Sequence, residues 1–318
     1  IILSINMSKS TPLVSVIIPA YNKSNYTVKS VRSVLNQTYN NIEVIVVNDG
    51  SIDDTEILIS NIKDKRIRLF NIKNRGACGA RNYGIDKSIG KYLSFLDCDD
   101  TYCENKIEES INFLERNNDY YFIYTNVNFI DENDTIVGKT PKFYNHPGSG
   151  FIASKLILCD YNITNSTLVM KKNCIKKIGY FDEKIFIPAD REFLIRLSSD
   201  YKGYYIDSFT TNYRVFEETV YIKTDEALNE FIYMINKFNN TKVIPNNKYY
   251  NKCISNVYYN FAKIYAYKKS IGKFRQLIFI SLKSNFFDMK IFIKLSGFIV
   301  SYISPKIILK YFDNYNKF

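Results

Sequence analysis

Apolar residues in the first hundred positions gather into short runs, and polar residues separate one run from the next. Leu13–Pro19, Ile42–Val47 and Tyr92–Leu96 are nearly continuous apolar stretches, and the first two are rich in β-branched side chains. Such runs are typical of strands that are buried on both faces. Between them, Tyr26–Asn36 carries valine and leucine at the spacing of one helical face. This alternation predicts an α/β fold in which a parallel sheet is flanked by helices.

Beyond residue 100 the pattern becomes more varied. Ile187–Leu197 has the period of a helix, whereas Gly203–Ile206 and Phe209–Val215 predict two closing strands. In the last hundred residues, Lys and Asn alternate with apolar positions, which predicts further helices. We therefore expect an N-terminal extension over residues 1–11, an α/β domain over 12–219 and a basic, amphipathic helical region over 220–318.

The net charge of +11 is confined to that C-terminal region. Residues 220–318 hold 16 Lys and Arg against 5 Asp and Glu, whereas the charges of residues 1–219 balance. Within 274–312, lysines are interleaved with Leu, Ile and Phe, as in basic amphipathic helices that lie on anionic membranes. The alternative is that these helices pack on the α/β domain with their lysines in solvent. Every apolar run is too short or too charged for a membrane-spanning helix, so we expect none.

Six cysteines and one histidine limit the available chemistry. None of the cysteines forms a C-x-x-C pair, which argues against a zinc site or a disulfide framework and favours reduced thiols in the cytosol. Because His146 is alone, Ser–His and Cys–His catalytic machinery is excluded. The basic region lacks a zinc-finger, helix-turn-helix or RNP-type motif, so we expect no nucleic-acid partner.

Three carboxylates follow the strand Tyr92–Leu96 directly: Asp97, Asp99 and Asp100. In open α/β sheets, ligands bind at the carboxyl ends of the strands, and these acids stand at such an end. Two carboxylates two residues apart can share a hard divalent cation, which prefers oxygen ligands. The alternative is an acidic turn in which Asp99 or Asp100 caps the next helix.

Four short segments carry a resemblance to a known family. They are VSVIIPAYN at Val14–Asn22, VVNDGS at Val46–Ser51, ARN at Ala80–Asn82 followed by Gly84, and FLDCDD at Phe95–Asp100. In this order and at this spacing they resemble the family 2 glycosyltransferases, over residues 12–215. The resemblance implies the GT-A fold, a Rossmann-like mixed sheet flanked by helices. It also implies an inverting transfer of a sugar from a nucleotide-diphospho-sugar.

The resemblance implies a donor site at the first three of these segments and at the acidic loop. Tyr21 would stack on the nucleobase, and Asp49 would accept a hydrogen bond from an imide N–H, which uracil and thymine have. Arg81 would reach the base edge or a phosphate; the alternative is a solvated arginine at a helix start. The residues implied in nucleotide-sugar binding are Pro19, Tyr21, Asn22, Asp49, Ser51, Arg81 and Asp97.

A divalent cation, Mn²⁺ or Mg²⁺, is also implied by the resemblance. Asp99 would be its direct ligand, and Asp97 would hold the ribose or the outer shell of the metal. The cation would act as a Lewis acid that stabilises the leaving UDP. Cys98 is not expected to be a ligand, because a hard cation prefers oxygen.

Asp190 is the implied general base, since a carboxylate can take the proton of an acceptor hydroxyl. The family usually shows Glu-Asp followed by an aromatic residue, whereas Ala189 precedes and Arg191 follows the aspartate here. The acceptor side therefore departs from the family pattern, and Arg191 and Glu192 are candidates for acceptor contact. The alternative is that Asp190 only caps its helix.

Together these features predict a metal-assisted inverting glycosyltransferase that uses a UDP-sugar. Its acceptor would be a lipid-linked or cell-envelope glycan, as in bacterial capsule or O-antigen assembly, at the inner face of the cell membrane. Two alternatives remain: a transferase for a protein or soluble acceptor, and an inactive nucleotide-sugar-binding or scaffold protein. A dinucleotide oxidoreductase is excluded, because Pro19 and Tyr21 stand where its glycine motif would lie.

Overall fold

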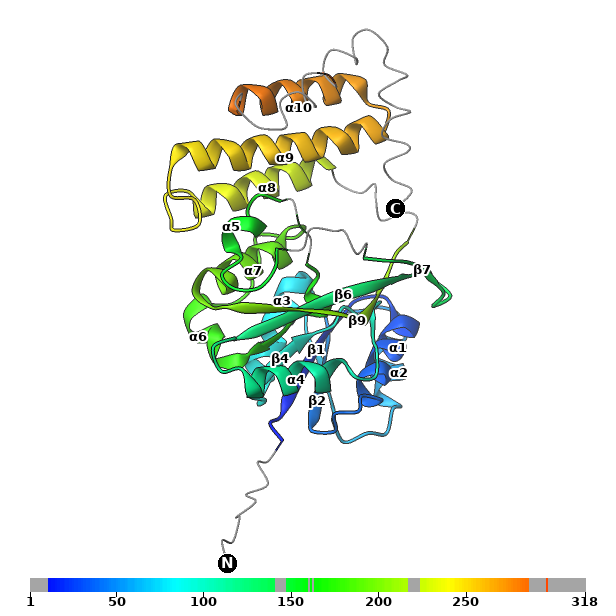
Figure 1. Cartoon of the computed structure of the whole chain (residues 1–318). Coiled ribbons are helices and arrows are strands. Elements are labelled where there is room, and N and C mark those ends of the chain that lie inside the picture. Colours follow the sequence, from blue (N-terminus) through cyan, green and yellow to red (C-terminus); the bar gives the residue numbers. More distant parts are fainter. Residues whose placement is uncertain are drawn as a thin grey trace, which may run out of the picture. The chain divides into compact units, whose positions relative to one another are not determined.

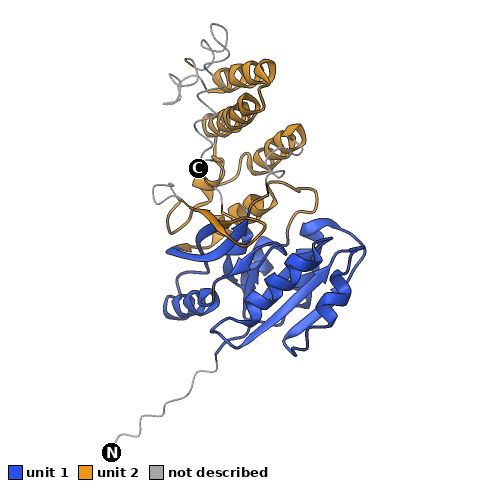
Figure 2. Cartoon of the chain, turned by 90° about the vertical axis from the view of Figure 1, so that its right-hand side faces the viewer, with its two compact units in different colours: residues 1–128, 165–180, 205–214 blue, residues 129–164, 181–204, 215–318 orange. Residues whose placement is uncertain are grey.

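The computed structural model of the chain describes residues 11–140, 147–159, 161, 163–216, 224–285 and 296. They form two compact units (Figure 2). Unit 1 comprises residues 1–128, 165–180 and 205–214, and unit 2 comprises residues 129–164, 181–204 and 215–318. Each unit is formed by three separate segments of the sequence. These units do not test the predicted domain boundary at residue 219, which stays a prediction.

A mixed sheet is the main element of unit 1 (Figure 1). Two of its strands include residues assigned to both units. The strand order is β3-β2-β1-β4-β8-β6-β9-β5, with β7 paired to β6. Neighbours among the first four are parallel, whereas β8 is antiparallel to both β4 and β6. The strands are β1 (Val14–Ala20), β2 (Ile42–Asn48), β3 (Ile67–Asn71), β4 (Tyr92–Phe95), β5 (Thr101–Tyr102), β6 (Phe122–Ile130), β7 (Ile136–Lys139), β8 (Val169–Lys171) and β9 (Gly203–Arg214).

The predicted double-sided burial of the first strands is confirmed. Every residue of β1, β2 and β4 is buried, whereas the residues of β3, at the end of the strand order, are only partly covered. The register pairs Val14 with Ile42 on one side and with Tyr92 on the other. The three strands therefore end close together, and the loops that follow them share one edge of the sheet.

Helices flank this sheet. In unit 1 they are α1 (Ser24–Leu35), α2 (Thr55–Ser60), α3 (Gly76–Lys87), α4 (Lys106–Arg116) and α6 (Ile175–Ile178). Both α1 and α3 contact β1 and β2. Gly84 allows α3 to approach the sheet, because a Cβ at this position would lie 2.4 Å from Cγ2 of Ile17. That distance is far inside van der Waals contact, so this helix position requires glycine.

Unit 2 is mainly helical. Its helices are α5 (Ala153–Leu156), α7 (Ala189–Asp200), α8 (Thr224–Phe238), α9 (Asn247–Tyr267) and α10 (Ile271–Ser284). α9 packs on both α8 and α10. Across the second contact, the buried Ser255 and Ser281 hydroxyls each donate to the backbone carbonyl of the other residue, at 2.8 and 2.7 Å. Helices are thus confirmed for the described part of the C-terminal region.

Some expectations differ from the structure or lie outside it. The two predicted closing strands are one continuous strand, β9, because Asp207 and Ser208 between them also have the extended strand conformation. Over the ranges given above, no helix is long and apolar enough to cross a membrane. The extension up to residue 10, His146 and residues 286–295 and 297–312 of the basic segment lie outside the described residues.

Candidate active site

The loops after β1 and β2 are tied to each other by hydrogen bonds. The backbone N–H of Asn22 donates to Oγ of Ser51 at 3.1 Å, and Oδ1 of Asn22 accepts from the N–H of Ile52 at 2.9 Å. Asn22 has a positive φ of 51°, a conformation that asparagine adopts more readily than most residues. Next to it, the Tyr21 side chain is 48% exposed. The sequence-predicted Tyr21, Asn22 and Ser51 therefore lie together, with an aromatic ring open to a ligand.

Asp49 is buried at the end of β2. Its Oδ1 accepts from the N–H of Arg75 at 2.8 Å, and its own N–H donates to the carbonyl of Ala20 at 2.8 Å. Asp49 thereby fixes the start of α3 against the ends of β1 and β2. The structure thus gives Asp49 a positioning role, and its contact with a nucleobase stays a prediction.

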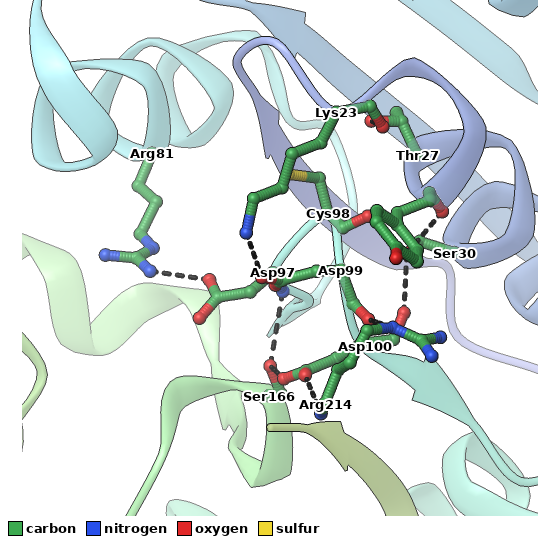
Figure 3. Close-up of polar contacts among 11 residues, drawn as sticks. Lys23, Thr27, Ser30, Arg81, Asp97, Cys98, Asp99, Asp100, Ser166 and Arg214 are labelled. Atoms are coloured by element: carbon green, nitrogen blue, oxygen red, sulfur yellow. Dashed lines mark hydrogen bonds and ion pairs between the residues drawn. The ribbon is translucent and has the colours of Figure 1, made fainter. Parts of the chain in front are cut away.

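The acidic loop after β4 faces α3. Nη2 of Arg81 on α3 donates to Oδ1 of Asp97 at 2.6 Å (Figure 3). The Arg81 side chain is almost fully buried, whereas that of Asp97 is 28% exposed. A buried guanidinium needs a carboxylate partner, so this pair fixes both the arginine and the start of the loop. Arg81 and Asp97, both predicted from the sequence, are direct partners.

Asp99 has a different cationic partner. Lys23, which follows the loop after β1, forms an ion pair with Oδ2 of Asp99 (Figure 3). Burial works against the charged form of Lys23, but the carboxylate of Asp99 outweighs it and raises the pKa of Lys23 above its ordinary value. The ammonium group of Lys23 therefore stands where a cation bound to Asp99 would be.

Asp100 is buried beneath the loop. Its carboxylate accepts from Oγ of Ser166 at 2.6 Å and from the N–H of Arg214 at 2.9 Å. Burial, together with the negative charges of Asp97 and Asp99, raises the pKa of Asp100 well above its usual range. From its other side, the Ser30 hydroxyl donates to the carbonyl of Asp100 at 2.5 Å. Asp100 therefore anchors the loop rather than capping α4.

The metal prediction can be compared with this donor set. Each of the three carboxylates has its own partner, and the part of the chain that the structure describes contains no group of three His, Cys, Asp or Glu side chains that could hold a metal ion. Asp99 fits a hard cation best, because its partner is a partly exposed lysine, whereas the partner of Asp97 is a buried arginine. Burial raises the pKa of the Cys98 thiol to about 12, which disfavours a thiolate ligand. The residues thus fit a cation that also takes oxygens from a bound donor.

The acceptor-side candidates lie on α7 in unit 2. Asp190 is partly exposed in the first turn of the helix. Glu192 is fully buried, and its two oxygens accept from Nε and Nη2 of Arg196, both at 2.7 Å. Lys237 adds a second ion pair to Glu192 at 2.9 Å, and Arg191 donates to the carbonyl of Leu156 at 3.0 Å. These contacts give Arg191 and Glu192 structural roles within unit 2, and their acceptor contact stays a prediction.

Sequence reasoning missed four residues of the acidic loop's surroundings: Lys23, Ser30, Ser166 and Arg214. Lys23 had a signal, because it directly follows the VSVIIPAYN segment. Ser166 and Arg214 lie 66 and 114 residues after Asp100, and no local pattern links them to it.

Comparisons with known proteins agree with the resemblance. The sequence model described as "Glycosyl transferase family 2" matches residues 15–174. An "Uncharacterized glycosyltransferase" of Rickettsia bellii is 54% identical over 120 residues, which is 37% of this chain and 17% of that protein. The chain thus spans about a fifth of the length of the first curated relatives it matches.

Two further matches cover more of the chain. The "UDP-Glc:alpha-D-GlcNAc-diphosphoundecaprenol beta-1,3-glucosyltransferase WfaP" of Escherichia coli is 38% identical over 53% of this chain and 64% of its own length. The crystal structure of S. aureus TarS residues 1–349 with UDP-GlcNAc has a TM-score of 0.64 and covers 84% of this chain and 81% of that one. At 16% identity, the TarS match supports the GT-A-like fold alone.

Proposed function

The chain belongs to glycosyl transferase family 2, and from this premise we propose that it transfers a sugar from a UDP-sugar to a hydroxyl group of a lipid-linked glycan. The observation that carries the proposal is the arrangement at the carboxyl ends of β1, β2 and β4. There the exposed Tyr21 ring and the Lys23–Asp99 pair lie on neighbouring loops of one sheet edge, and Arg81 reaches Asp97 from α3. Ligands of open α/β sheets bind at this edge.

The donor would be held by these loops in three parts. The nucleobase would stack on Tyr21, with Pro19, Asn22, Asp49 and Ser51 forming the walls of its pocket. Because Asn22 and Ser51 are already hydrogen-bonded to each other, the pocket needs little rearrangement to accept a base. The names of two similar proteins, which mention UDP-Glc and UDP-GlcNAc, support a UDP-sugar.

The diphosphate would lie next to the cationic groups of the acidic loop. Lys23 and Arg81 each carry a positive charge that is balanced by one aspartate. Lys23 can turn toward phosphate oxygens, whereas the buried Arg81 would add its charge from its fixed place beside Asp97. Asp97 would then hold the ribose. A bound Mn²⁺ or Mg²⁺ would be held by Asp99 and would supply Lewis-acid stabilisation of the leaving UDP.

Asp190 is the proposed general base. It would accept the proton of the acceptor hydroxyl as the new bond to the sugar forms. The acceptor proposed here is a glycan on a polyprenyl diphosphate, by analogy with the acceptor named for WfaP. The lysines of the C-terminal region would then hold the protein at the inner face of a bacterial cell membrane during capsule or O-antigen assembly.

The test is release of nucleoside diphosphate from UDP-, dTDP- and GDP-sugars, with GlcNAc-diphosphoundecaprenol as acceptor, in Mn²⁺ and in EDTA. We expect turnover with one UDP-sugar, lost in EDTA. Asp190→Asn should reduce turnover by about a hundredfold or more while leaving UDP binding unchanged. Glu226→Gln, which removes an exposed acid of α8, is the matched control and should keep full activity.

Two other results would change the proposal. Turnover that requires a protein or soluble glycan would replace the lipid-linked acceptor. UDP binding without turnover would favour an inactive nucleotide-sugar-binding protein, and absence of both turnover and UDP binding would favour a scaffold protein.

A further inference from the structure

Unit 1 contains a cavity of about 470 Å³ that the proposed reaction does not use. Its walls include four lysines (Lys91, Lys171, Lys172 and Lys176) together with Asp86 and Tyr180. They come from the end of α3, the residue before β4, the end of β8, and the segment that contains α6. The cavity is therefore built from elements that pack against each other within one unit.

The cavity lies at the opposite end of β4 from the acidic loop. Lys171 pairs with Tyr92, the first residue of β4, whereas Asp97 follows the last residue, Phe95. Four strand residues span about 13 Å, so the lysines are well separated from the donor site. A ligand in this cavity would not compete with the nucleotide for the same residues.

The charges of this cavity are poorly balanced. Asp86 is the one acidic wall residue, and it accepts a hydrogen bond from the Tyr180 hydroxyl at 2.5 Å. Lys91 forms an ion pair at 2.5 Å with Glu115, a residue that does not line the cavity. The remaining three lysines form no ion pair with any carboxylate in the described ranges. Four lysines against one aspartate give the cavity wall an excess of positive charge, which suits an anion.

Backbone contacts hold two of these ammonium groups in place. Nζ of Lys171 donates to the carbonyl of Asn118 at 3.0 Å, and Nζ of Lys172 donates to the carbonyl of Ser88. Each lysine ammonium has three N–H donors, so both retain donors for a further partner. Lys176 lies exposed on α6 at the rim. Two ammonium groups with backbone contacts and one exposed ammonium group therefore line the same cavity, as a group with several oxygens would require.

The electrostatics of Lys171 agree with this. Burial lowers the pKa of Lys171 below its ordinary value. The positive charge of Lys91 acts in the same direction, whereas Cys174, Glu115 and Asp119 act against it without reversing the shift. A group with this environment gains more from an anionic partner than a solvated surface lysine does.

We propose that this cavity binds a phosphate-bearing anion through Lys171, Lys172 and Lys176. Phosphate fits because it carries up to two charges on oxygens that can accept from several ammonium groups at once. The same chemistry is presented by an anionic phospholipid headgroup and by a free phosphate or diphosphate compound. The proposal does not depend on the transferase activity, because the residues are separate from those of the donor site.

Lysine footprinting with mass spectrometry tests the proposal on the full chain. Acetylation rates are measured for each lysine with and without inorganic pyrophosphate. We expect pyrophosphate to slow acetylation of Lys171, Lys172 and Lys176 by about tenfold, while Lys63 and Lys65, exposed in the same unit, change less than twofold. Equal changes at the cavity and control lysines would overturn the proposal. The residue-level readout separates this cavity from pyrophosphate bound at the donor site.

Two further measurements identify the source of the bound phosphate group and exclude a folding defect. Vesicles of phosphatidylglycerol are compared with vesicles of phosphatidylcholine. Protection by phosphatidylglycerol as well as pyrophosphate indicates a lipid headgroup, and protection by pyrophosphate alone indicates a free phosphate compound. Equal protection by both kinds of vesicle, with none by pyrophosphate, would overturn recognition of an anionic phosphate group. Lys176→Gln, at an exposed position, should weaken pyrophosphate protection of Lys171 about threefold to tenfold, whereas Lys63→Gln should not.

Discussion

Replacing Lys23 by methionine tests how the acidic loop holds a cation. The side chain keeps its length but loses the charge that pairs with Asp99. If Mn²⁺ binds Asp99, it must displace this ammonium group or bind beside it, and both are unfavourable. We therefore expect Lys23→Met to bind Mn²⁺ more tightly than the wild type when no donor is present.

The size of the effect follows from the exposure of the pair. The Lys23 side chain is 38% exposed and that of Asp99 is 19% exposed, so solvent screens the ion pair in part. An exposed pair contributes about 0.2–1 kcal/mol, and this one should lie at the upper end. Since 1.4 kcal/mol corresponds to a tenfold change, about 1 kcal/mol predicts about fivefold tighter Mn²⁺ binding.

Electron paramagnetic resonance of free Mn²⁺ measures this affinity without any turnover. Lys63→Met removes the same charge from an exposed position in unit 1 and should leave the affinity unchanged. Adding Asp99→Asn to Lys23→Met should abolish the gain. Unchanged or weaker Mn²⁺ binding by Lys23→Met would show that Lys23 does not compete for the cation site, and the assignment of Asp99 would be refuted.

Two further predictions concern stability. Gly90→Ala should lower the free energy of unfolding by about 1–3 kcal/mol, because a Cβ would lie 2.7 Å from the backbone nitrogen of Ser15 and 2.8 Å from the carbonyl oxygen of Leu13. In urea denaturation followed by circular dichroism, Gly272→Ala is the control, since no atom lies within 4 Å of its added Cβ. An equal effect of both changes would contradict the close approach. Lys106 is fully buried, and burial lowers its pKa to about 7 from the value of 10.5 expected when unfolded. Between these values the unfolded chain binds more protons, so stability should rise with pH, by up to about 1.4 kcal/mol per unit. Lys106→Met should remove this increase of stability with pH when denaturation is measured at pH 7 and at pH 9. An unchanged slope of stability against pH would refute the lowered pKa of Lys106.

The parallel half of the sheet could be predicted because its signal is local. Each of the strands β1, β2 and β4 is a continuous apolar run, and burial on both faces leaves such a run few alternatives. The antiparallel half gave a weaker signal. β8 has only three residues and lies between β4 and β6 in the sheet, an order that the chain sequence does not indicate.

The sequence indicated several residues of the candidate site but none of the pairs that they form. Tyr21, Asp49, Arg81 and Asp97 were identified because they lie in short segments with recognisable spacing. That Arg81 would pair with Asp97, and Lys23 with Asp99, depends on how α3 and the loop after β1 approach the acidic loop. Pairing of this kind is a tertiary property, and no spacing along the chain encodes it.

The different partners of the three aspartates explain how an acidic loop can be both ordered and open to a ligand. Asp100 is fixed by buried hydrogen bonds, and Asp97 is held by a guanidinium that is itself buried. Asp99 is paired with a half-exposed lysine, whose flexible chain can turn away without breaking the core. A cation or a diphosphate therefore needs to displace only Lys23, while the other two carboxylates keep the loop in place.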